Sequence, residues 1–292
     1  MSAIKGILLA GGTGSRLYPL TSVVTKQMLP VYDKPLLYYP LATLMLAGIK
    51  DILVISTPED QPAYQRLLGD GGQLGLSLSY AAQPKPNGIA EALLIGKSFL
   101  AGARVMLILG DNIFFGHGLQ PVLHMAREKT DGATIFGYWV SDPKRFGVVD
   151  LDTDGNPTAI TEKPTEPRSH YAVTGLYFYD HRASDLAAEL TPSARGELEI
   201  TDLNRRYLEL GELSVHRLQR GFAWLDAGTP DALLDAANYV ATLERRQGLK
   251  IACLEEIAWR QQWIDNAGLN SLVEAMPDNS YRDYLIRIRS EG

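Results

Sequence analysis

Three glycines, one arginine and one lysine near the N-terminus form a pattern suited to binding a chain of phosphates. Gly11, Gly12 and Gly14 follow a short apolar run, so the backbone can turn tightly there and present N–H groups to an anion without side chains in the way. Arg16 and Lys26 add fixed positive charge beside these donors. A glycine turn after a first strand is often only structural, but the added cations favour a triphosphate site.

The spacing of the glycines decides between kinds of nucleotide site. A dinucleotide-binding turn requires G-x-G-x-x-G, and Leu17 stands where the last glycine belongs. No stretch of the chain matches the P-loop pattern G-x-x-x-x-G-K-[ST]. The pattern present is G-G-x-G-x-R-L-x-P-x-T, continuing through Lys26 and Pro30 to Lys34-Pro35. It therefore disfavours an NAD-dependent oxidoreductase, the first rival class.

Two aspartates are candidate ligands for a magnesium ion. Asp111 ends the apolar run 105–109, and Asp226 precedes a Gly-Thr-Pro helix start. Mg²⁺ usually binds one or two carboxylates together with phosphate oxygens. Each aspartate has an alternative role as a helix N-cap, and spacing alone does not show that the two converge.

Other polar positions are candidate contacts for a phosphate, a base or a sugar. Lys163 lies in the sequence Glu-Lys-Pro directly after an expected strand, and a compact ammonium suits a mobile phosphate. Gln83 opens a Pro/Gly-rich loop, and its amide can both donate to and accept from a pyrimidine edge, with Gly88 allowing close backbone approach. The segments 173–177 and 196–202 are candidate walls of a sugar pocket, although Thr201 is equally a candidate helix cap.

Apolar runs alternate with helical segments, which predicts a mostly parallel sheet covered on both faces. In such sheets, ligands bind beyond the carboxyl ends of the strands. The expected strands are 4–10, 51–57, 76–83, 103–110, 133–140, 147–151, 159–162 and 171–179. The expected helices are 35–47, one capped by Asn87 and running to Leu100, 182–190, 201–210 and 230–247. The tail beyond Cys253 reads as several short amphipathic helices, so we expect a core over residues 1–250 with a helical annex over 251–292 in the same globular unit.

Composition limits the classes of partner. The net charge is −6, which offers no general attraction to nucleic acid or anionic lipid. Cys253 is the single cysteine, so no intrachain disulfide forms and a reducing compartment is expected. The N-terminal apolar run is too short for a signal peptide, and no stretch approaches the ~18–20 apolar residues of a membrane span. We expect a cytoplasmic protein with no nucleic-acid or membrane partner.

Eight ordered motifs along nearly the whole chain resemble those of the sugar-1-phosphate nucleotidyltransferase family, in particular its members that transfer a thymidylyl group to glucose 1-phosphate. The motifs are G-G-T-G-S-R-L-Y-P-L-T, K-Q-M-L-P, Q-P-x-P-x-G-I-A, L-G-D-N, E-K-P, A-V-T-G-L-Y-F-Y, R-G-E-L-E-I-T-D and W-L-D-x-G-T. The resemblance implies a Rossmann-like, three-layer α/β fold with a mixed, mostly parallel sheet, and self-association as a homotetramer.

The resemblance also implies a role for each matched residue. The catalytic residues would be Arg16, Lys26, Lys163, Asp111 and Asp226, and the two aspartates would bind Mg²⁺. The residues that bind dTTP would be Leu8, Gly11, Gly12, Thr13, Gly14, Gln27, Gln83 and Gly88. The residues that bind glucose 1-phosphate would be Asn112, Gly147, Glu162, Lys163, Val173 and Tyr177. The implied products are dTDP-glucose and pyrophosphate, at the first step of a dTDP-rhamnose type of deoxysugar supply for cell-surface polysaccharide.

Some features leave alternatives open. Phe146 stands where many relatives carry tyrosine, so a role for this position in hexose selection is in doubt. Gly116, Arg220 and Arg260 are candidates for an effector site of the family, with surface positions as the alternative. Thymine and uracil differ by one methyl group, typically worth only ~1–3 kcal/mol, so a uridylyltransferase or a dual enzyme is the second prediction. A non-catalytic sugar-nucleotide-binding regulator is a more distant one.

Overall fold

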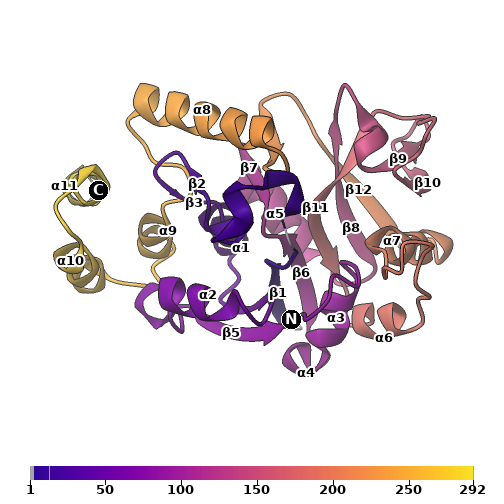
Figure 1. Cartoon of the computed structure of the whole chain (residues 1–292), viewed down its shortest axis with the longest axis horizontal. Helices are drawn as coiled ribbons and strands as arrows, with labels where there is room; N and C mark the ends of the chain where they lie inside the picture. The colour runs from indigo at the N-terminus through magenta and orange to yellow at the C-terminus, as the bar shows by residue number, and fades with distance from the viewer. Residues whose placement is uncertain (1–2, 13, 292) are drawn as a thin grey trace.

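The computed structural model describes residues 3–12 and 14–291 and has a nine-stranded mixed sheet at its centre. The main path of the sheet runs β10-β9-β11-β6-β1-β4-β5, and β8 pairs with both β11 and β12. Figure 1 shows helices on both sides of this sheet, which confirms the predicted α/β fold with a mixed central sheet. The strands are β1 (Ile4–Leu9), β4 (Asp51–Ser56), β5 (Ser77–Ala82), β6 (Arg104–Leu109), β8 (Ala133–Trp139), β9 (Gly147–Leu151), β10 (Pro157–Glu162), β11 (Tyr171–Tyr179) and β12 (Leu213–Leu218).

The sheet has two differently built halves. β1, β4, β5 and β6 are mutually parallel, as βαβ crossovers require, whereas β11 runs antiparallel to β6, β8 and β9, and β9 pairs antiparallel with β10. Separate antiparallel pairs are formed by β2 (Pro30–Val31) with β3 (Lys34–Pro35), and by β7 (Asn112–Gly116) with β13 (Phe222–Asp226).

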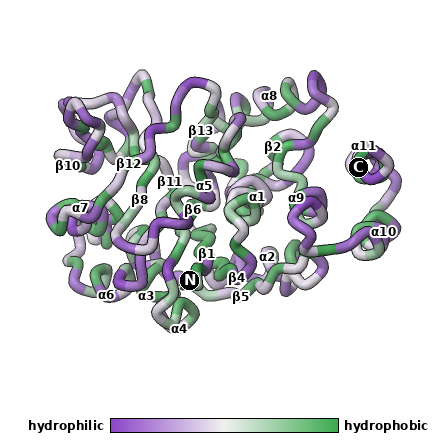
Figure 2. Tube along the Cα trace, turned by 180° about the vertical axis from the view of Figure 1, so that it is seen from behind, coloured by the Kyte–Doolittle hydropathy of each residue, from purple (hydrophilic) through white to green (hydrophobic). Residues whose placement is uncertain are grey.

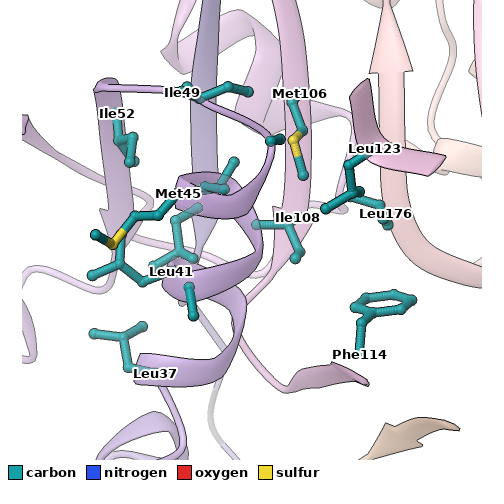
Figure 3. Close-up of a cluster of buried hydrophobic side chains, with 14 of the residues drawn as sticks. Leu37, Leu41, Met45, Ile49, Ile52, Met106, Ile108, Phe114, Leu123 and Leu176 are labelled. Carbon is teal, nitrogen blue, oxygen red and sulfur yellow. The ribbon is translucent and has the colours of Figure 1, made fainter. Parts of the chain in front are cut away.

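Alternation along the central strands explains the three layers. In β1, Leu8 belongs to one buried cluster, whereas Ile7 and Leu9 belong to another. Because successive strand residues point to opposite faces, both faces of the sheet are buried. On one face, Leu41 and Met45 of α1 belong to the same buried cluster as Ile108, Leu176 and Phe114 (Figure 3). Figure 2 shows hydrophobic residues along β1, β6 and α1.

The helices cover the sheet and extend it at one side. They are α1 (Tyr38–Leu46), α2 (Gln61–Leu68), α3 (Glu91–Ile95), α4 (Lys97–Leu100), α5 (Leu119–Glu128), α6 (Ala183–Ala188), α7 (Ile200–Glu209), α8 (Pro230–Gln247), α9 (Leu254–Arg260), α10 (Asn266–Ala275) and α11 (Ser280–Glu291). Leu254 and Ala258 of α9 belong to the main core, whereas α10 and α11 share a small cluster of their own with Cys253. These last two helices lie at the edge of the molecule opposite α7 (Figure 1). None of the helices in the described part of the chain is long and apolar enough to span a bilayer.

Several predicted boundaries are wrong for local reasons. The helix expected from Pro35 begins only at Tyr38, because Lys34 and Pro35 pair with β2. The segment after Asn87 forms two short helices, and the Asn87 side chain donates to the Glu91 carboxylate instead of accepting from a backbone N–H at the start of the helix. The alternative role of Thr201 as a cap is also wrong, because it lies inside α7, where Glu199 is the N-cap residue.

Candidate active site

The glycine loop adopts the tight backbone that its sequence predicts. Gly12 and Gly14 have φ values of 104° and 57°, a region that side chains disfavour. The Gly14 carbonyl accepts bonds from the Leu17 N–H at 2.8 Å and from Thr21 Oγ1 at 3.0 Å, which closes the turn. Thr13 lies outside the described residues. Leu8 is fully buried in the core, so the structure leaves its side chain no access to a nucleotide.

The Gln27 side chain binds the backbone of the glycine loop. Its Nε2 donates to the Gly11 carbonyl at 3.4 Å, and its Oε1 accepts from Thr25 Oγ1 at 2.9 Å. The Tyr64 hydroxyl lies 3.2 Å from both Gln27 Oε1 and the Ala10 carbonyl. Gln27 and Tyr64 are buried, so this network fixes the loop before any ligand arrives. Gln27 thus has a positioning role, and the part played by Tyr64 was missed from the sequence.

Gln83 lies beside the same loop. Its Nε2 donates to the Gly88 carbonyl at 3.1 Å and to Glu91 Oε2 at 2.7 Å. A Cβ added to Gly11 would lie 3.2 Å from Gln83 Oε1, so the amide oxygen faces the loop. Gly88 has a φ of 110°, and a Cβ there would lie 2.3 Å from the Leu198 carbonyl oxygen. The glycine is thus required for packing against the segment that precedes α7.

Lys26 and Asp111 form a short ion pair at the carboxyl end of β6. Lys26 is buried, and its Nζ donates to Asp111 Oδ2. Burial raises the Asp111 pKa, but the Lys26 ammonium outweighs that effect and holds the pKa below its usual value. Asn112 Nδ2 donates to Asp111 Oδ1 at 2.7 Å, while its Oδ1 accepts from the Gly175 N–H and Trp224 Nε1. Asn112, predicted as a sugar contact, therefore also orients the Asp111 carboxylate.

Asp226 is brought to the same place by the pairing of β13 with β7, in which it lies opposite Asn112. Thr229, not Asp226, caps α8, so the alternative role of Asp226 as a cap is wrong. Burial raises the Asp226 pKa, with a further increase from the Asp111 charge, although Arg145, 3.7 Å from Oδ2, acts against both. A Cβ added to Gly228 would lie 3.1 Å from Arg16 Nη2 and 3.4 Å from Asp226 Oδ2. Arg16 and both aspartates thus converge.

The residues present fit a magnesium ion. Asp111 and Asp226 line one cleft, and two carboxylates completed by phosphate oxygens match the preference of Mg²⁺. The described residues contain no group of three or more His, Cys, Asp or Glu side chains able to hold a metal by themselves. A metal at this position would therefore depend on substrate oxygens for the rest of its ligands.

Groups suited to a sugar phosphate lie across the cleft, at the ends of β9, β10 and β11. Glu162 Oε2 accepts from Thr201 Oγ1 at 2.6 Å, and Glu162 Oε1 lies 3.3 Å from Arg195 Nη2. Lys163 has a φ of 42°, an unusual value for a non-glycine residue, and its N–H donates to the Phe146 carbonyl at 3.0 Å. Its side chain is half-exposed, with Nζ 3.4 Å from Glu162 Oε1. The backbone strain thus occurs at the lysine predicted to bind phosphate.

One cleft of about 280 Å³ joins the two sets of groups. Of the predicted site residues, it is lined by Arg16, Asp111, Asn112, Gly147, Glu162, Lys163, Val173, Tyr177 and Asp226. Lys26 reaches it through Asp111, whereas Gln27, Gln83 and Gly88 lie behind or beside the glycine loop. Phe146 also lines the cleft and packs on Trp224, with ring centroids 5.1 Å apart.

The predicted effector residues do not all meet. Gly116 and Arg260 line a cavity of about 610 Å³ between α1, the loop after β7 and α9. Arg220 lines a different cavity, beside Trp139 and Arg217 at the end of β12.

Two residues at the cleft were missed by the sequence reasoning, Arg145 and Arg195. Arg145 lines the cleft beside Asp226, while Arg195 binds both Glu162 and Glu199, and Glu199 lines the cleft beside Thr201. A signal existed for Arg195, because it is the first residue of the matched motif R-G-E-L-E-I-T-D, and Glu199 lies in the segment 196–202 that was predicted as a wall of the sugar pocket. Arg145 precedes Phe146-Gly147, and only the fold turns its guanidinium toward β13.

Comparison with known proteins agrees with this geometry. A family model described as nucleotidyl transferase matches residues 5–242. A glucose-1-phosphate thymidylyltransferase from Xanthomonas campestris pv. campestris is 56% identical over 292 residues, covering 100% of this chain and 99% of the relative. A protein of the same name from Mycobacterium tuberculosis is 52% identical over 285 residues, 98% of this chain and 99% of that protein.

Solved structures of other proteins resemble this chain in fold. One from Bacillus anthracis, described as a glucose-1-phosphate thymidylyltransferase in complex with sucrose, is 43% identical with a TM-score of 0.76, covering 81% of this chain and 95% of that one. A UDP-glucose pyrophosphorylase shares the fold at 22% identity and a TM-score of 0.72, covering 82% of this chain and 100% of that one. With a family model that spans most of the sequence and full-length relatives above half identity, the chain belongs to the nucleotidyl transferase family.

Proposed function

We propose that this protein transfers a thymidylyl group from dTTP to glucose 1-phosphate, giving dTDP-glucose and pyrophosphate. The observation that carries the proposal is the single cleft in which Arg16 and the Asp111–Asp226 pair face Glu162 and Lys163. A triphosphate on the glycine loop would meet a sugar phosphate held on the opposite wall. The names of the full-length relatives support the same reaction.

The reaction requires positioning and charge stabilisation rather than a protein nucleophile. A phosphate oxygen of glucose 1-phosphate attacks the α-phosphorus of dTTP, forming a new P–O bond. The bond from that phosphorus to the bridging oxygen of the β-phosphate breaks, and pyrophosphate leaves with the electron pair. Lys163 would hold the attacking phosphate, and the Arg16 fork would stabilise the charge that develops on the leaving pyrophosphate.

Asp111 and Asp226 would hold a Mg²⁺ ion. When bound, this ion neutralises phosphate charge and makes the α-phosphorus more electrophilic. Lys26 then keeps Asp111 ionised, and Asn112 keeps its carboxylate oriented. On the other wall, Glu162 is held by Thr201 and Arg195, so that its carboxylate is ready to accept bonds from sugar hydroxyls.

Use of UTP is the second candidate, and one observation favours it. The Gln83 amide oxygen faces the glycine loop, and this acceptor suits the imide N–H of uracil as well as that of thymine. The resemblance also supports a cytoplasmic homotetramer that supplies activated deoxysugars. The cavity lined by Gly116 and Arg260 remains the proposed effector site, and on this geometry Arg220 of the same chain is not part of it.

A pyrophosphate-release assay tests the proposal. Purified protein would be given dTTP, UTP, dCTP or ATP with several hexose 1-phosphates, with and without Mg²⁺. We expect the highest kcat/KM with dTTP and glucose 1-phosphate, UTP second, and no turnover without the metal. Equal rates with all four triphosphates would contradict the assignment. Binding of dTTP without turnover would instead indicate the regulator that the sequence left open.

A further inference from the structure

The side chain of Gln83 is oriented by the Gly88 carbonyl and by Glu91, a residue to which the proposed reaction gives no role. Its Nε2 lies 3.1 Å from the Gly88 carbonyl oxygen and 2.7 Å from Glu91 Oε2. Both partners only accept hydrogen bonds, because one is a carbonyl and the other a carboxylate. Gln83 is buried, so an amide turned the other way would place its oxygen against two acceptors. That arrangement costs the lost bonds and adds repulsion.

The same contacts decide what Gln83 presents to a ligand. With its NH₂ group held by Gly88 and Glu91, the amide has only its oxygen left to face the glycine loop. A Cβ on Gly11 would lie 3.2 Å from that oxygen, so the oxygen is next to the loop backbone. A base beside this loop therefore meets a hydrogen-bond acceptor.

Glu91 is held in place by a further contact. It is the first residue of α3, and its Oε1 accepts from Asn87 Nδ2 at 2.8 Å while Oε2 accepts from Gln83. The backbone around it is fixed to the segment before α7, because the Ala90 N–H donates to the Leu198 carbonyl and the Leu198 N–H to the Asn87 carbonyl. The carboxylate thus has a defined direction toward Gln83.

We propose that Glu91 is a positioning residue for base selection: it fixes the Gln83 amide so that its oxygen accepts from the imide N–H of thymine or uracil and rejects cytosine. Cytosine carries an unprotonated N3, so its N3 acceptor would face the Gln83 amide oxygen, which is also an acceptor. A buried polar group left unpaired in this way discriminates far more strongly than the presence or absence of a methyl group. The inference rests on the proposed function, because it takes Gln83 as the residue that meets the base.

The substitution Glu91→Gln tests this role with little change of shape. A glutamine at this position can turn either its oxygen or its NH₂ group toward Gln83. The Gln83 amide can then bond to residue 91 in either of its two orientations. Only the Gly88 carbonyl would then hold the orientation. We expect the preference for dTTP over dCTP to fall by about tenfold, both in kcat/KM and in equilibrium binding of the nucleotide alone. The ratio of dTTP to UTP should stay the same, because both bases carry the imide N–H.

Asn87→Ala is the matched control. It removes the contact to the other oxygen of the Glu91 carboxylate and leaves the contact to Gln83. We expect it to retain the wild-type preference, because the backbone bonds between the Asn87–Ala90 segment and Leu198 still place Glu91, and its bond to Gln83 remains. Thermal unfolding of both variants would confirm that they are folded. If folded Glu91→Gln kept the wild-type ratio of dTTP to dCTP, or lost affinity for both nucleotides equally, the inference would be wrong. A wild-type protein with no preference for dTTP over dCTP would contradict the proposed function itself.

Discussion

The two walls of the cleft hold their functional groups in different ways. On the nucleotide wall, Lys26, Gln27, Gln83 and Asn112 are 3–7% exposed, and each is bound by other groups that are buried or half-buried. On the sugar wall, the side chains of Lys163 and Arg195 are 48% and 42% exposed. Ion pairs at such exposure are weak and screened by salt, whereas buried networks keep one geometry. The nucleotide wall is therefore preformed, and the sugar wall is adjustable.

Topology explains the difference. The nucleotide wall lies at the carboxyl ends of parallel strands that are buried on both faces, so the polar groups behind the glycine loop are enclosed, while Arg16 on the loop itself is exposed. The outer part of the sugar wall is built on β9 and β10, at one end of the sheet path, where α7 packs against β10. Groups at such an edge remain in contact with water and can follow the shape of a hexose.

The prediction with the largest expected effect concerns the stability of the framework that carries the sugar wall. Asp180 follows β11 and is buried, accepting bonds from the Gly132 N–H at 2.8 Å and the Tyr207 hydroxyl at 2.9 Å, with Arg182 beside it. Asp180→Asn should lower the free energy of unfolding by about 3–4 kcal/mol, because it leaves buried donors without a charged partner. Denaturant unfolding measures this loss, while the KM for dTTP should not change.

The pH dependence of that loss has a definite sign. Burial raises the Asp180 pKa, but the hydrogen bond from Arg182 and the backbone N–H bonds outweigh it and hold the pKa below its usual value. The stability that Asp180 contributes is therefore complete above the pKa of an unfolded aspartate, about 3.9, and is lost as the pH falls below it. The difference between wild type and Asp180→Asn should shrink there. Asp185→Asn, at an exposed pair with Lys97, is the control and should change little.

The second prediction tests the nucleotide wall. Arg16→Ala should cost about 3 kcal/mol of transition-state stabilisation, roughly a hundredfold in kcat/KM, because it removes the planar fork that would hold the leaving pyrophosphate beside the glycine loop. Arg16→Lys keeps the charge but loses the fork, so it should recover only part of the rate. Steady-state kinetics at saturating glucose 1-phosphate measures both. A loss of less than about threefold in Arg16→Ala would remove this residue from the mechanism.

The sequence indicated the walls of the cleft but not how they meet. Strands 147–151 and 171–179 were predicted with the bounds that β9 and β11 have, because their apolar patterns are long and bordered by turn residues. The pairing of β7 with β13 had no such signal, although it is what brings Asp226 to Asp111. Such pairing depends on contacts between segments far apart in the chain, which local patterns do not encode. For the same reason the sequence did not indicate that Tyr64 braces the loop or that Arg145 faces Asp226.

The third prediction separates the two walls directly. Lys163→Met removes the ammonium that would hold the phosphate of glucose 1-phosphate, which is worth about 2 kcal/mol for a charged hydrogen bond. The kcat/KM for glucose 1-phosphate should fall by roughly thirtyfold, whereas binding of dTTP without sugar should be unchanged. Equal losses for both substrates would show that the walls do not act separately.

The prediction with the smallest expected effect concerns the space beside Gly147 on the sugar wall. A Cβ added to Gly147 would lie 3.2 Å from Thr201 Oγ1 and 3.3 Å from Glu162 Oε2, closer than most side-chain contacts. Because Glu162 is partly exposed and belongs to the adjustable wall, we expect it to yield by a few tenths of an ångström. Gly147→Ala should therefore raise the KM for glucose 1-phosphate by about fivefold, near 1 kcal/mol, and leave the KM for dTTP unchanged. A much larger loss would mean that the sugar wall is as rigid as the nucleotide wall, and the contrast between them would then fail.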